Sequence, residues 1–151
     1  MTDSSANPGP DRFNLARFLD AQEGVYSSAL AELKSGRKRT HWIWFIFPQI
    51  DGLGSSSTAR RFAIRSLDEA SAYLAHPILG RRLLDCCRAL LALPTTSATD
   101  AMGYPDDLKL RSSMTLFALV ADGQPEFESV LAKFFGGHKD AKTLELLQRQ
   151  H

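Results

Sequence analysis

Apolar residues recur every three or four positions along most of the chain, which is the pattern of amphipathic helices. The first such stretch runs from Asp11 to Leu33, and Gly24 is a point at which it can divide into two helices. Five later stretches have the same spacing: 66–75, 77–93, 105–121, 125–136 and 140–148. The chain is therefore expected to be all-α, a compact single-domain orthogonal bundle of about six to eight helices over residues 11–151.

Residues that cap helices lie at the ends of these stretches. Asp11 and Ser66 are N-cap residues directly before an apolar period, and Glu69 completes a capping box with Ser66. Gly36 occupies the place of a left-handed C-cap, and Pro105 that of a first helical residue. Residues 1–10 are mostly Ser, Asn, Pro and Gly and have no apolar period, so we expect them to form a disordered tail.

One segment, residues 41–48, departs from the helical pattern. Its sequence HWIWFIFP is aromatic and β-branched, and these residue types favour a strand. The chain contains no second stretch of this kind to pair with it, and an unpaired buried backbone is costly. We therefore favour a short buried helix capped by Thr40, with a strand as the alternative.

Charge is distributed unevenly along the chain. The 18 Lys and Arg residues against 17 Asp and Glu residues give a formal net charge of +1, which argues against a nucleic-acid-binding surface. Seven basic residues and one acidic residue lie between Lys34 and Arg65, so this block carries +6 and the remainder carries −5. Such a block indicates either an anionic partner or a solvated basic face.

Composition also bears on compartment and on metal binding. The longest apolar runs have six residues, far fewer than the roughly 20 that cross a bilayer, and no secretory segment is visible at the start. Cys86 and Cys87 are adjacent and unsuited to a disulfide with each other, which fits a reducing, cytoplasmic environment. No spacing typical of a metal site, a P-loop or a dinucleotide motif occurs, so we expect no metal and no cofactor.

Two blocks carry a resemblance to a known family. They are residues 38–49, followed by Gly52-Leu53-Gly54, and residues 106–117, with the sequence DDLKLRSSMTLF. Together they resemble the domain-of-unknown-function 1810 family, small bacterial proteins for which the resemblance implies a compact all-α domain and no assigned reaction. Such proteins are sometimes labelled calpastatin, but inhibitors of that type are long disordered segments, whereas this chain has a core-forming composition.

Both blocks place polar and basic residues among apolar ones, which makes them the candidate site. Indole rings can stack on a base or a sugar, and basic residues with hydroxyl groups suit an anion. The hydroxyl groups of residues 112, 113 and 115 either bond a carbonyl one turn back or line a pocket. We predict a pocket between the His41–Gln49 segment and the Lys109–Thr115 helix that binds a small anionic ligand, a nucleotide or a phosphorylated metabolite. The predicted ligand-binding residues are His41, Trp42, Trp44, Gln49, Lys109, Arg111, Ser112 and Ser113.

Two alternatives stay open at this point. The aromatic block is equally suited to a protein–protein interaction module without a small-molecule site, although the sequence identifies no protein partner. A hydrolase- or transferase-type enzyme would use His41 as acid or base and Ser113 as nucleophile.

Overall fold

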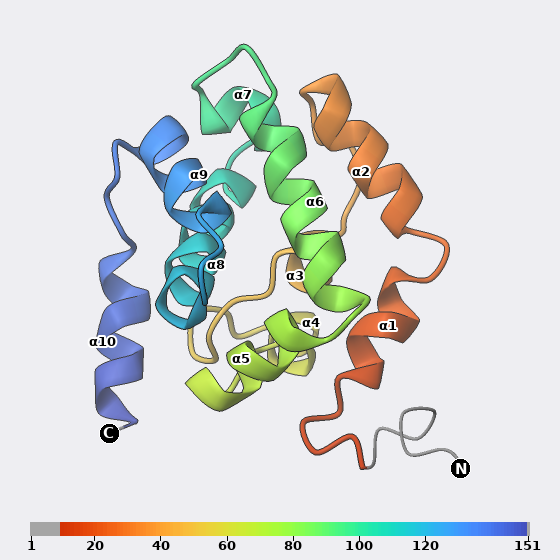
Figure 1. The fold of residues 1–151 in the computed structure, drawn as a ribbon, viewed down its shortest axis with the longest axis vertical. Coiled ribbons are helices and arrows are strands. Elements are labelled where there is room, and N and C mark those ends of the chain that lie inside the picture. Colours follow the sequence, from red (N-terminus) through yellow and green to blue (C-terminus); the bar gives the residue numbers. More distant parts are fainter. Residues whose placement is uncertain (1–9, 151) are drawn as a thin grey trace.

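The computed structural model describes residues 10–150, and within them the chain forms ten helices and no strand (Figure 1). The helices are α1 (Ala16–Gln22), α2 (Tyr26–Ser35), α3 (Ile43–Ile46), α4 (Ser57–Arg61), α5 (Leu67–Ala75), α6 (Leu79–Leu91), α7 (Ala98–Met102), α8 (Asp106–Val120), α9 (Glu126–Phe135) and α10 (Ala141–Arg149). The predicted all-α fold is confirmed. The count exceeds the expected one because α4 and α7, of five residues each, are too short to show an apolar period. Apart from Pro10, the tail expected over residues 1–10 lies outside the described residues.

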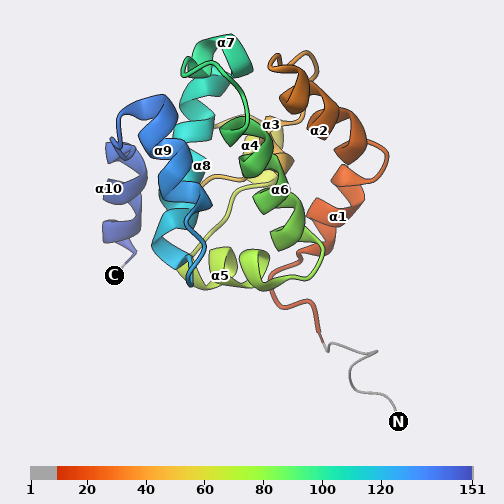
Figure 2. The ribbon, with the colours of Figure 1, turned by 45° about the horizontal axis from the view of Figure 1, so that its top comes forward.

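Helix α8 is the centre of the arrangement. It contacts α3, α5, α7, α9 and α10, while α1 and α2 lie on one side of the molecule and α9 and α10 on the other (Figures 1 and 2). Surrounded in this way, α8 buries polar as well as apolar side chains, among them Ser113 and Thr115. This explains why its sequence lacks a clean polar face.

A chain of aromatic contacts links the helices around the core. The ring of Tyr73 on α5 meets Phe18 on α1 edge to face, with centroids 5.0 Å apart. On its other side it approaches Phe117 on α8 at 5.4 Å, and Phe117 stacks on Phe127 of α9 at 5.8 Å. Such pairs add about 0.5–1.5 kcal/mol each beyond the area they bury. Four helices distant in sequence are thus joined through one row of rings.

Most of the predicted helix ends are confirmed. Gly24 has a φ of 75° and separates α1 from α2, and Gly36 has a φ of 83° as the left-handed cap of α2. Two ends differ from the prediction: Pro105 is the N-cap of α8 and not its first residue, and Asp11 is not the N-cap of α1, which begins at Ala16. The Asp11 carboxylate instead accepts hydrogen bonds from the amides of residues 15 and 16, at 2.7 and 2.8 Å. The Ser66 hydroxyl accepts from the Glu69 amide at 3.1 Å, while the Glu69 carboxylate accepts from the Arg65 amide.

The aromatic segment contains the helix that we favoured, but only one turn of it, Ile43–Ile46. The expected Thr40 cap is wrong: no side chain caps α3, and the Thr40 hydroxyl instead donates to the Glu32 carboxylate at 2.6 Å. After the turn the chain extends, and Ile50 forms an isolated parallel bridge with Ile64. The strand-like pairing therefore lies just after α3, at Ile50, and not within residues 41–48.

Arg17 joins α1 to the segment between α4 and α5. Its guanidinium group donates to five oxygens at 2.7–2.9 Å: the carbonyls of Phe13, Asn14, Arg61 and Ala63, and the carboxylate of Glu69. An arginine has five N–H donors, so every one of them is used. The side chains of Arg17 and Glu69 are only 10% and 3% exposed, which makes this a buried and fully satisfied pair.

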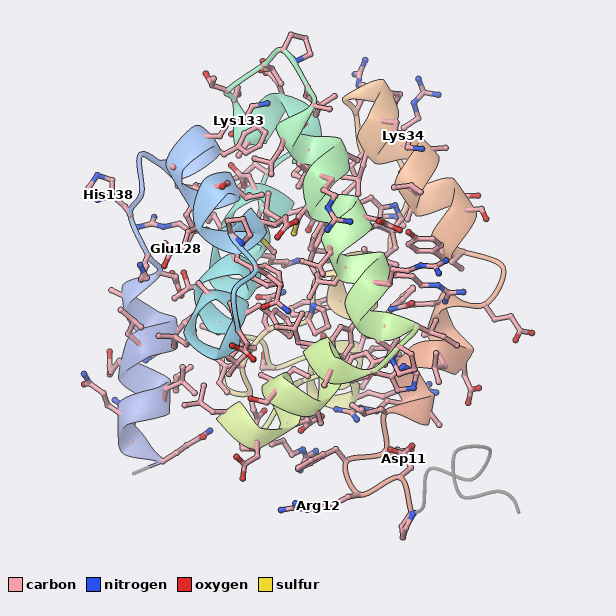
Figure 3. All side chains as sticks on the ribbon, viewed as in Figure 1. Asp11, Arg12, Lys34, Glu128, Lys133 and His138 are labelled. Atoms are coloured by element: carbon pink, nitrogen blue, oxygen red, sulfur yellow. The ribbon has the colours of Figure 1, made fainter. Side chains whose placement is uncertain are left out.

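The basic block of residues 34–65 does not form one face. Lys38 is 5% exposed and pairs with Asp106 on α8 at 2.7 Å. Arg61 and Arg65 lie instead beside Arg12, and Figure 3 shows Arg12 and Lys34 at opposite ends of the molecule. The other six basic residues of the block are exposed, so the block is mostly solvated, but its charges lie at several separate places.

Three further findings concern chemistry in the described part of the chain. No helix of residues 10–150 is long and apolar enough to cross a membrane, and no three His, Cys, Asp or Glu residues there are placed to hold a metal ion. Cys86 and Cys87 are buried free thiols on α6. Burial raises the pKa of the Cys86 thiol to about 12, so it is not an activated nucleophile.

Candidate ligand-binding site

The Glu32 carboxylate on α2 binds the residues that lead into the aromatic segment. It accepts hydrogen bonds from the amides of Arg39 and Thr40 at 2.6 and 2.9 Å, and from the Trp42 indole at 3.0 Å. Burial alone would raise the pKa of this carboxyl, but these bonds and that of the Thr40 hydroxyl outweigh burial and lower the pKa to about 2. Trp42 is 1% exposed and committed to this network.

Trp44, two residues on, points elsewhere. Its ring lies against Gly54, where a Cβ atom would come within 2.9 Å of the indole carbon Cη2. The Lys109 ammonium lies 4.5 Å from the ring centroid, which is the geometry of a cation–π contact. A residue without a side chain and a cation from α8 thus set the orientation of this indole.

Lys109 and Lys38 share one carboxylate at the start of α8. Asp106 accepts from Lys109 at 3.2 Å and from Lys38 at 2.7 Å. Burial favours the neutral carboxyl, but the hydrogen bonds and charges of the two lysines prevail and lower the pKa of Asp106. The Lys109 side chain is 26% exposed, so its ammonium keeps access to solvent.

Gln49 follows the aromatic turn and is almost completely buried, at 4% exposure. Its carbonyl accepts from the Ile64 amide at 2.8 Å, which fixes the backbone. Its side-chain nitrogen Nε2, however, has no hydrogen-bond partner within residues 10–150. A buried amide donor without a partner costs about 1–3 kcal/mol, so the surroundings of this atom matter.

Gln49, Trp44 and Lys109 line one cavity of about 270 Å³, which we call the Trp44–Lys109 cavity. Its remaining lining residues are Leu53, Pro105, Leu108, Arg111, Ser112 and Asp140. It lies where the segment after α3 meets the first turns of α8 and the start of α10. Five of the eight residues predicted from the sequence are therefore neighbours: Trp44, Gln49, Lys109, Arg111 and Ser112.

Several polar groups in this wall are already committed. The Arg111 guanidinium donates to the carbonyls of His138 and Lys139, both at 3.0 Å, and so holds the loop before α10. The Asp140 carboxylate caps α10 through the amide and hydroxyl of Thr143. The Ser112 hydroxyl donates to the Leu108 carbonyl at 3.2 Å but retains acceptor capacity. Among the described residues, the donors with capacity left are Lys109, the Gln49 amide and the three N–H groups of Arg111 that these two bonds do not use.

Three predicted residues do not line the cavity. His41 is exposed at the surface, and Trp42 is turned toward Glu32. Ser113 is 0% exposed, and its hydroxyl has no partner within the described residues. The hydroxyls at 112 and 115 both bond the carbonyl one turn back, as one of our two interpretations held.

The turn at 52–58 is rich in Gly and Ser, and turns of this composition can present free amides to an anion. In the structure the Ser56 hydroxyl accepts from the Ala59 amide at 3.1 Å and caps α4. With five residues, α4 is also too short for a substantial dipole. This turn contributes Gly54, against Trp44, rather than an anion-binding nest.

Comparison with known proteins identifies the family. A family profile described as protein of unknown function, DUF1810, matches residues 12–147. The chain belongs to this family. The solved structure of a conserved hypothetical protein from Mycobacterium tuberculosis is similar, with 51% sequence identity and a TM-score of 0.89. The match covers 91% of this chain and 99% of that one, whereas no protein of curated function matches.

Other residues that shape the DUF1810 site were missed from the sequence. Glu32 lies seven to ten residues before the groups that it bonds, and nothing in its local sequence marks it. Asp140 lies at the start of a predicted helix, but its place in the cavity wall depends on how α10 packs against α8. Asp106 lay within the second block, but only as a carboxylate near a helix start. Its spacing of three residues from Lys109 was the signal that could have linked the two.

Proposed function

We propose that this protein binds a small anionic ligand in the Trp44–Lys109 cavity through a phosphate or carboxylate group. The observation that carries the proposal is the Gln49 side chain in the cavity wall, whose buried nitrogen Nε2 has no hydrogen-bond partner within residues 10–150. An anionic oxygen is the strongest type of acceptor for such a donor. A bound ligand would therefore remove the cost of the unpaired amide.

Lys109 supports the same class of ligand. Its ammonium lies over the Trp44 ring and uses one of its three donors on Asp106, so further donors are available. The Trp44 indole beside it offers an apolar surface to the organic part of the ligand. Cation, amide donor and indole together suit a phosphorylated or carboxylated metabolite.

The size of the cavity favours a small ligand over a nucleotide. Its volume of about 270 Å³ is at the small end for ligand sites, which span roughly 300–1,000 Å³. We infer that a small phosphorylated metabolite fits within it, whereas a nucleotide would place only one of its parts inside. The nucleotide of our first expectation is thus the less favoured of the two ligands.

Thermal-shift screening followed by calorimetry tests the proposal. Orthophosphate, glycerol phosphate and adenosine monophosphate are compared at millimolar concentration, because a ligand of the folded state raises the melting temperature. We expect glycerol phosphate to give the largest shift, and we expect the variants Gln49→Leu and Lys109→Gln to abolish it. The matched control is Lys142→Gln, which changes a half-exposed lysine outside the cavity.

Each outcome decides the proposal. No shift with any of the three compounds, or a shift that Gln49→Leu and Lys109→Gln leave unchanged, would overturn it and favour the interaction module. Because His41 is exposed and outside the cavity, His41→Ala is expected to leave binding intact. Loss of binding in that variant would favour the enzyme alternative instead.

A further inference from the structure

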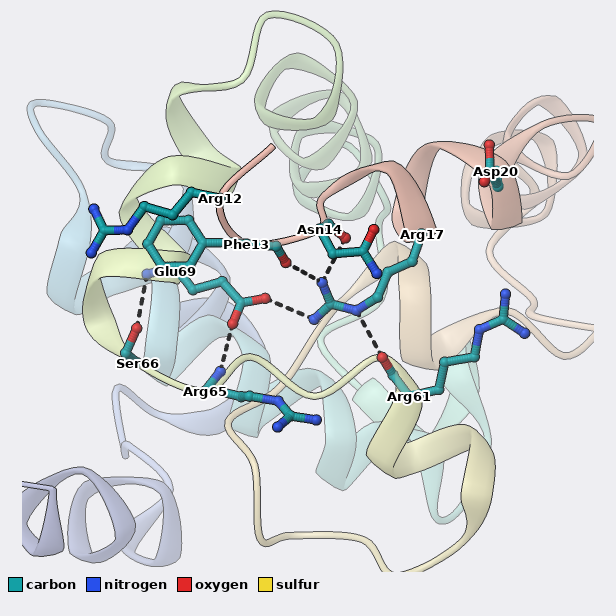
Figure 4. A pocket seen from close by; sticks show the side chains of 9 residues that line it. All are labelled: Arg12, Phe13, Asn14, Arg17, Asp20, Arg61, Arg65, Ser66 and Glu69. Carbon is teal, nitrogen blue, oxygen red and sulfur yellow. Dashed lines mark hydrogen bonds and ion pairs between the residues drawn. The ribbon is translucent and has the colours of Figure 1, made fainter. Parts of the chain in front are cut away.

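A second, larger hollow lies at the other end of the basic block, around the Arg17–Glu69 pair (Figure 4). Its volume is about 630 Å³, and we call it the arginine hollow. The residues that line it are Arg12, Phe13, Asn14, Arg17, Asp20, Arg61, Arg65, Ser66 and Glu69. They come from α1 with the segment before it and from the α4–α5 segment, so the hollow is separate from the Trp44–Lys109 cavity.

The positive charges of this hollow are only partly compensated. Arg17 and Glu69 neutralise each other. Within residues 10–150, none of Arg12, Arg61 and Arg65 forms an ion pair, although all three are exposed. Asp20 is the one other acid in the lining, and no ion pair among the described residues includes it. Three guanidinium groups thus face one carboxylate, which leaves a positive potential over the hollow.

Two of the arginine side chains make cation–π contacts with neighbouring rings. The guanidinium carbon of Arg12 lies 4.7 Å from the Phe13 ring centroid, and that of Arg61 lies 5.2 Å from the Phe62 ring centroid. A cation–π contact uses no hydrogen-bond acceptor, so the guanidinium keeps N–H groups for hydrogen bonds. In Figure 4 the three free guanidinium groups lie on three sides of the Arg17–Glu69 pair.

We propose that the arginine hollow binds a small molecule that carries two or more phosphate groups. A guanidinium edge matches a phosphate in a bidentate manner, and three edges around one hollow engage more than one phosphate at a time. The volume lies inside the usual range of roughly 300–1,000 Å³ for small-molecule sites, whereas one orthophosphate ion would leave most of it empty.

Two arginines of the hollow can be substituted without removing the main-chain contacts of the Arg17–Glu69 pair. It is the carbonyl of Arg61 and the amide of Arg65, not their side chains, that bond Arg17 and Glu69. The double variant Arg61→Gln/Arg65→Gln therefore removes two cations and keeps the main-chain contacts. A matched control is Arg60→Gln/Arg81→Gln, which removes the same charge at two exposed positions outside the hollow.

The experiment is calorimetric titration of the full-length protein with inorganic pyrophosphate and, separately, with a duplex oligonucleotide at the same salt concentration. We expect pyrophosphate to bind the wild type and the control alike, and to bind Arg61→Gln/Arg65→Gln about tenfold more weakly or not at all. Circular dichroism verifies that all variants are folded. The titrations are repeated in the Lys109→Gln background, which removes the cation of the Trp44–Lys109 cavity. The difference between Arg61→Gln/Arg65→Gln and its control is expected to persist there, which separates the arginine hollow from that cavity.

Three results would overturn the inference. They are no binding of pyrophosphate to the wild type up to about 10 mM, equal weakening in both double variants, and binding of the oligonucleotide alone. The second would mean that net charge rather than the hollow attracts the ion. The third would mean a nucleic-acid surface, whose affinity would also fall steeply with salt.

Discussion

Arg17 and Lys109 show two ways in which a cation can be paired in this fold. Arg17 meets Glu69 at 2.7 Å, is 10% exposed, and has all five donors bonded. Lys109 meets Asp106 at 3.2 Å, is 26% exposed, and has donors to spare. Both pairs meet the distance criterion for a salt bridge, but only the Arg17 guanidinium has all of its donors hydrogen-bonded. We call such a group saturated. The number of unused donors, rather than the presence of a salt bridge, separates a cation that holds the fold from one that can bind a ligand.

The largest expected effect comes from breaking the saturated pair. Arg17→Met leaves the Glu69 carboxylate buried without its counter-ion and removes the guanidinium donor from the carbonyls of residues 13, 61 and 63, whereas the Asn14 carbonyl keeps the amide of residue 17. We expect the free energy of unfolding to fall by about 3–5 kcal/mol, measured by urea denaturation. Arg12→Met, on the exposed arginine five residues earlier, should cost less than about 0.5 kcal/mol. Similar losses in both variants would contradict the distinction between saturated and unsaturated cations.

A second test concerns Glu32, whose carboxylate is held by hydrogen bonds and forms no ion pair within residues 10–150. Because its pKa is about 2 in the folded chain against an ordinary value of 4.5, ionised Glu32 stabilises the fold above pH 4.5, and this contribution is lost as the pH falls toward 2. Glu32→Gln should cost about 1–2 kcal/mol at neutral pH, with a difference from wild type that vanishes in acid. Denaturation at several pH values measures it, with exposed Glu23→Gln as the control. A difference independent of pH would show that the charge of Glu32 does not matter.

Among the ion-paired and hydrogen-bonded groups of Arg17, Glu32 and Lys109, the smallest effect on stability is expected at Lys109. Its pair with Asp106 is partly exposed, and Asp106 keeps Lys38 when Lys109 is replaced. Lys109→Gln should therefore change the free energy of unfolding by less than about 1 kcal/mol, by the same urea measurement. Together with the expected loss of ligand binding, this would place Lys109 in the unsaturated class. A loss as large as that of Arg17→Met would assign it to the fold instead.

The fold was largely predictable because its helix ends are marked locally. Gly24, Gly36 and Ser66 act through residues within one turn of themselves, and such effects are visible in sequence. Helices α4 and α7 were not predicted, because a helix of about one turn shows no recurring spacing of apolar residues. The Thr40 cap failed because the hydroxyl is taken by Glu32, eight residues away on another helix.

The candidate site was predictable only as two blocks that meet. Which side of each block faces the cavity depends on rotation about the helix axis, and adjacent residues differ there by about 100°. Hence Ser112 lines the cavity while Ser113 is buried, and Trp44 lines it while Trp42 does not. The buried role of Arg17 was not predicted, because its partners Arg61 and Glu69 lie 44 and 52 residues along the chain.

The carboxylate of Asp106, shared by Lys38 and Lys109, acts as a competitor built into the protein. Under the proposed function, an anion in the Trp44–Lys109 cavity and the Asp106 carboxylate, 3.2 Å from the Lys109 ammonium, would attract the same cation. Because Lys109 uses one of its three donors on Asp106, the anion would engage the other two. Lys38, nearly buried and 2.7 Å from the same carboxylate, would remain with Asp106, so a bound anion would not leave that carboxylate without a counter-ion.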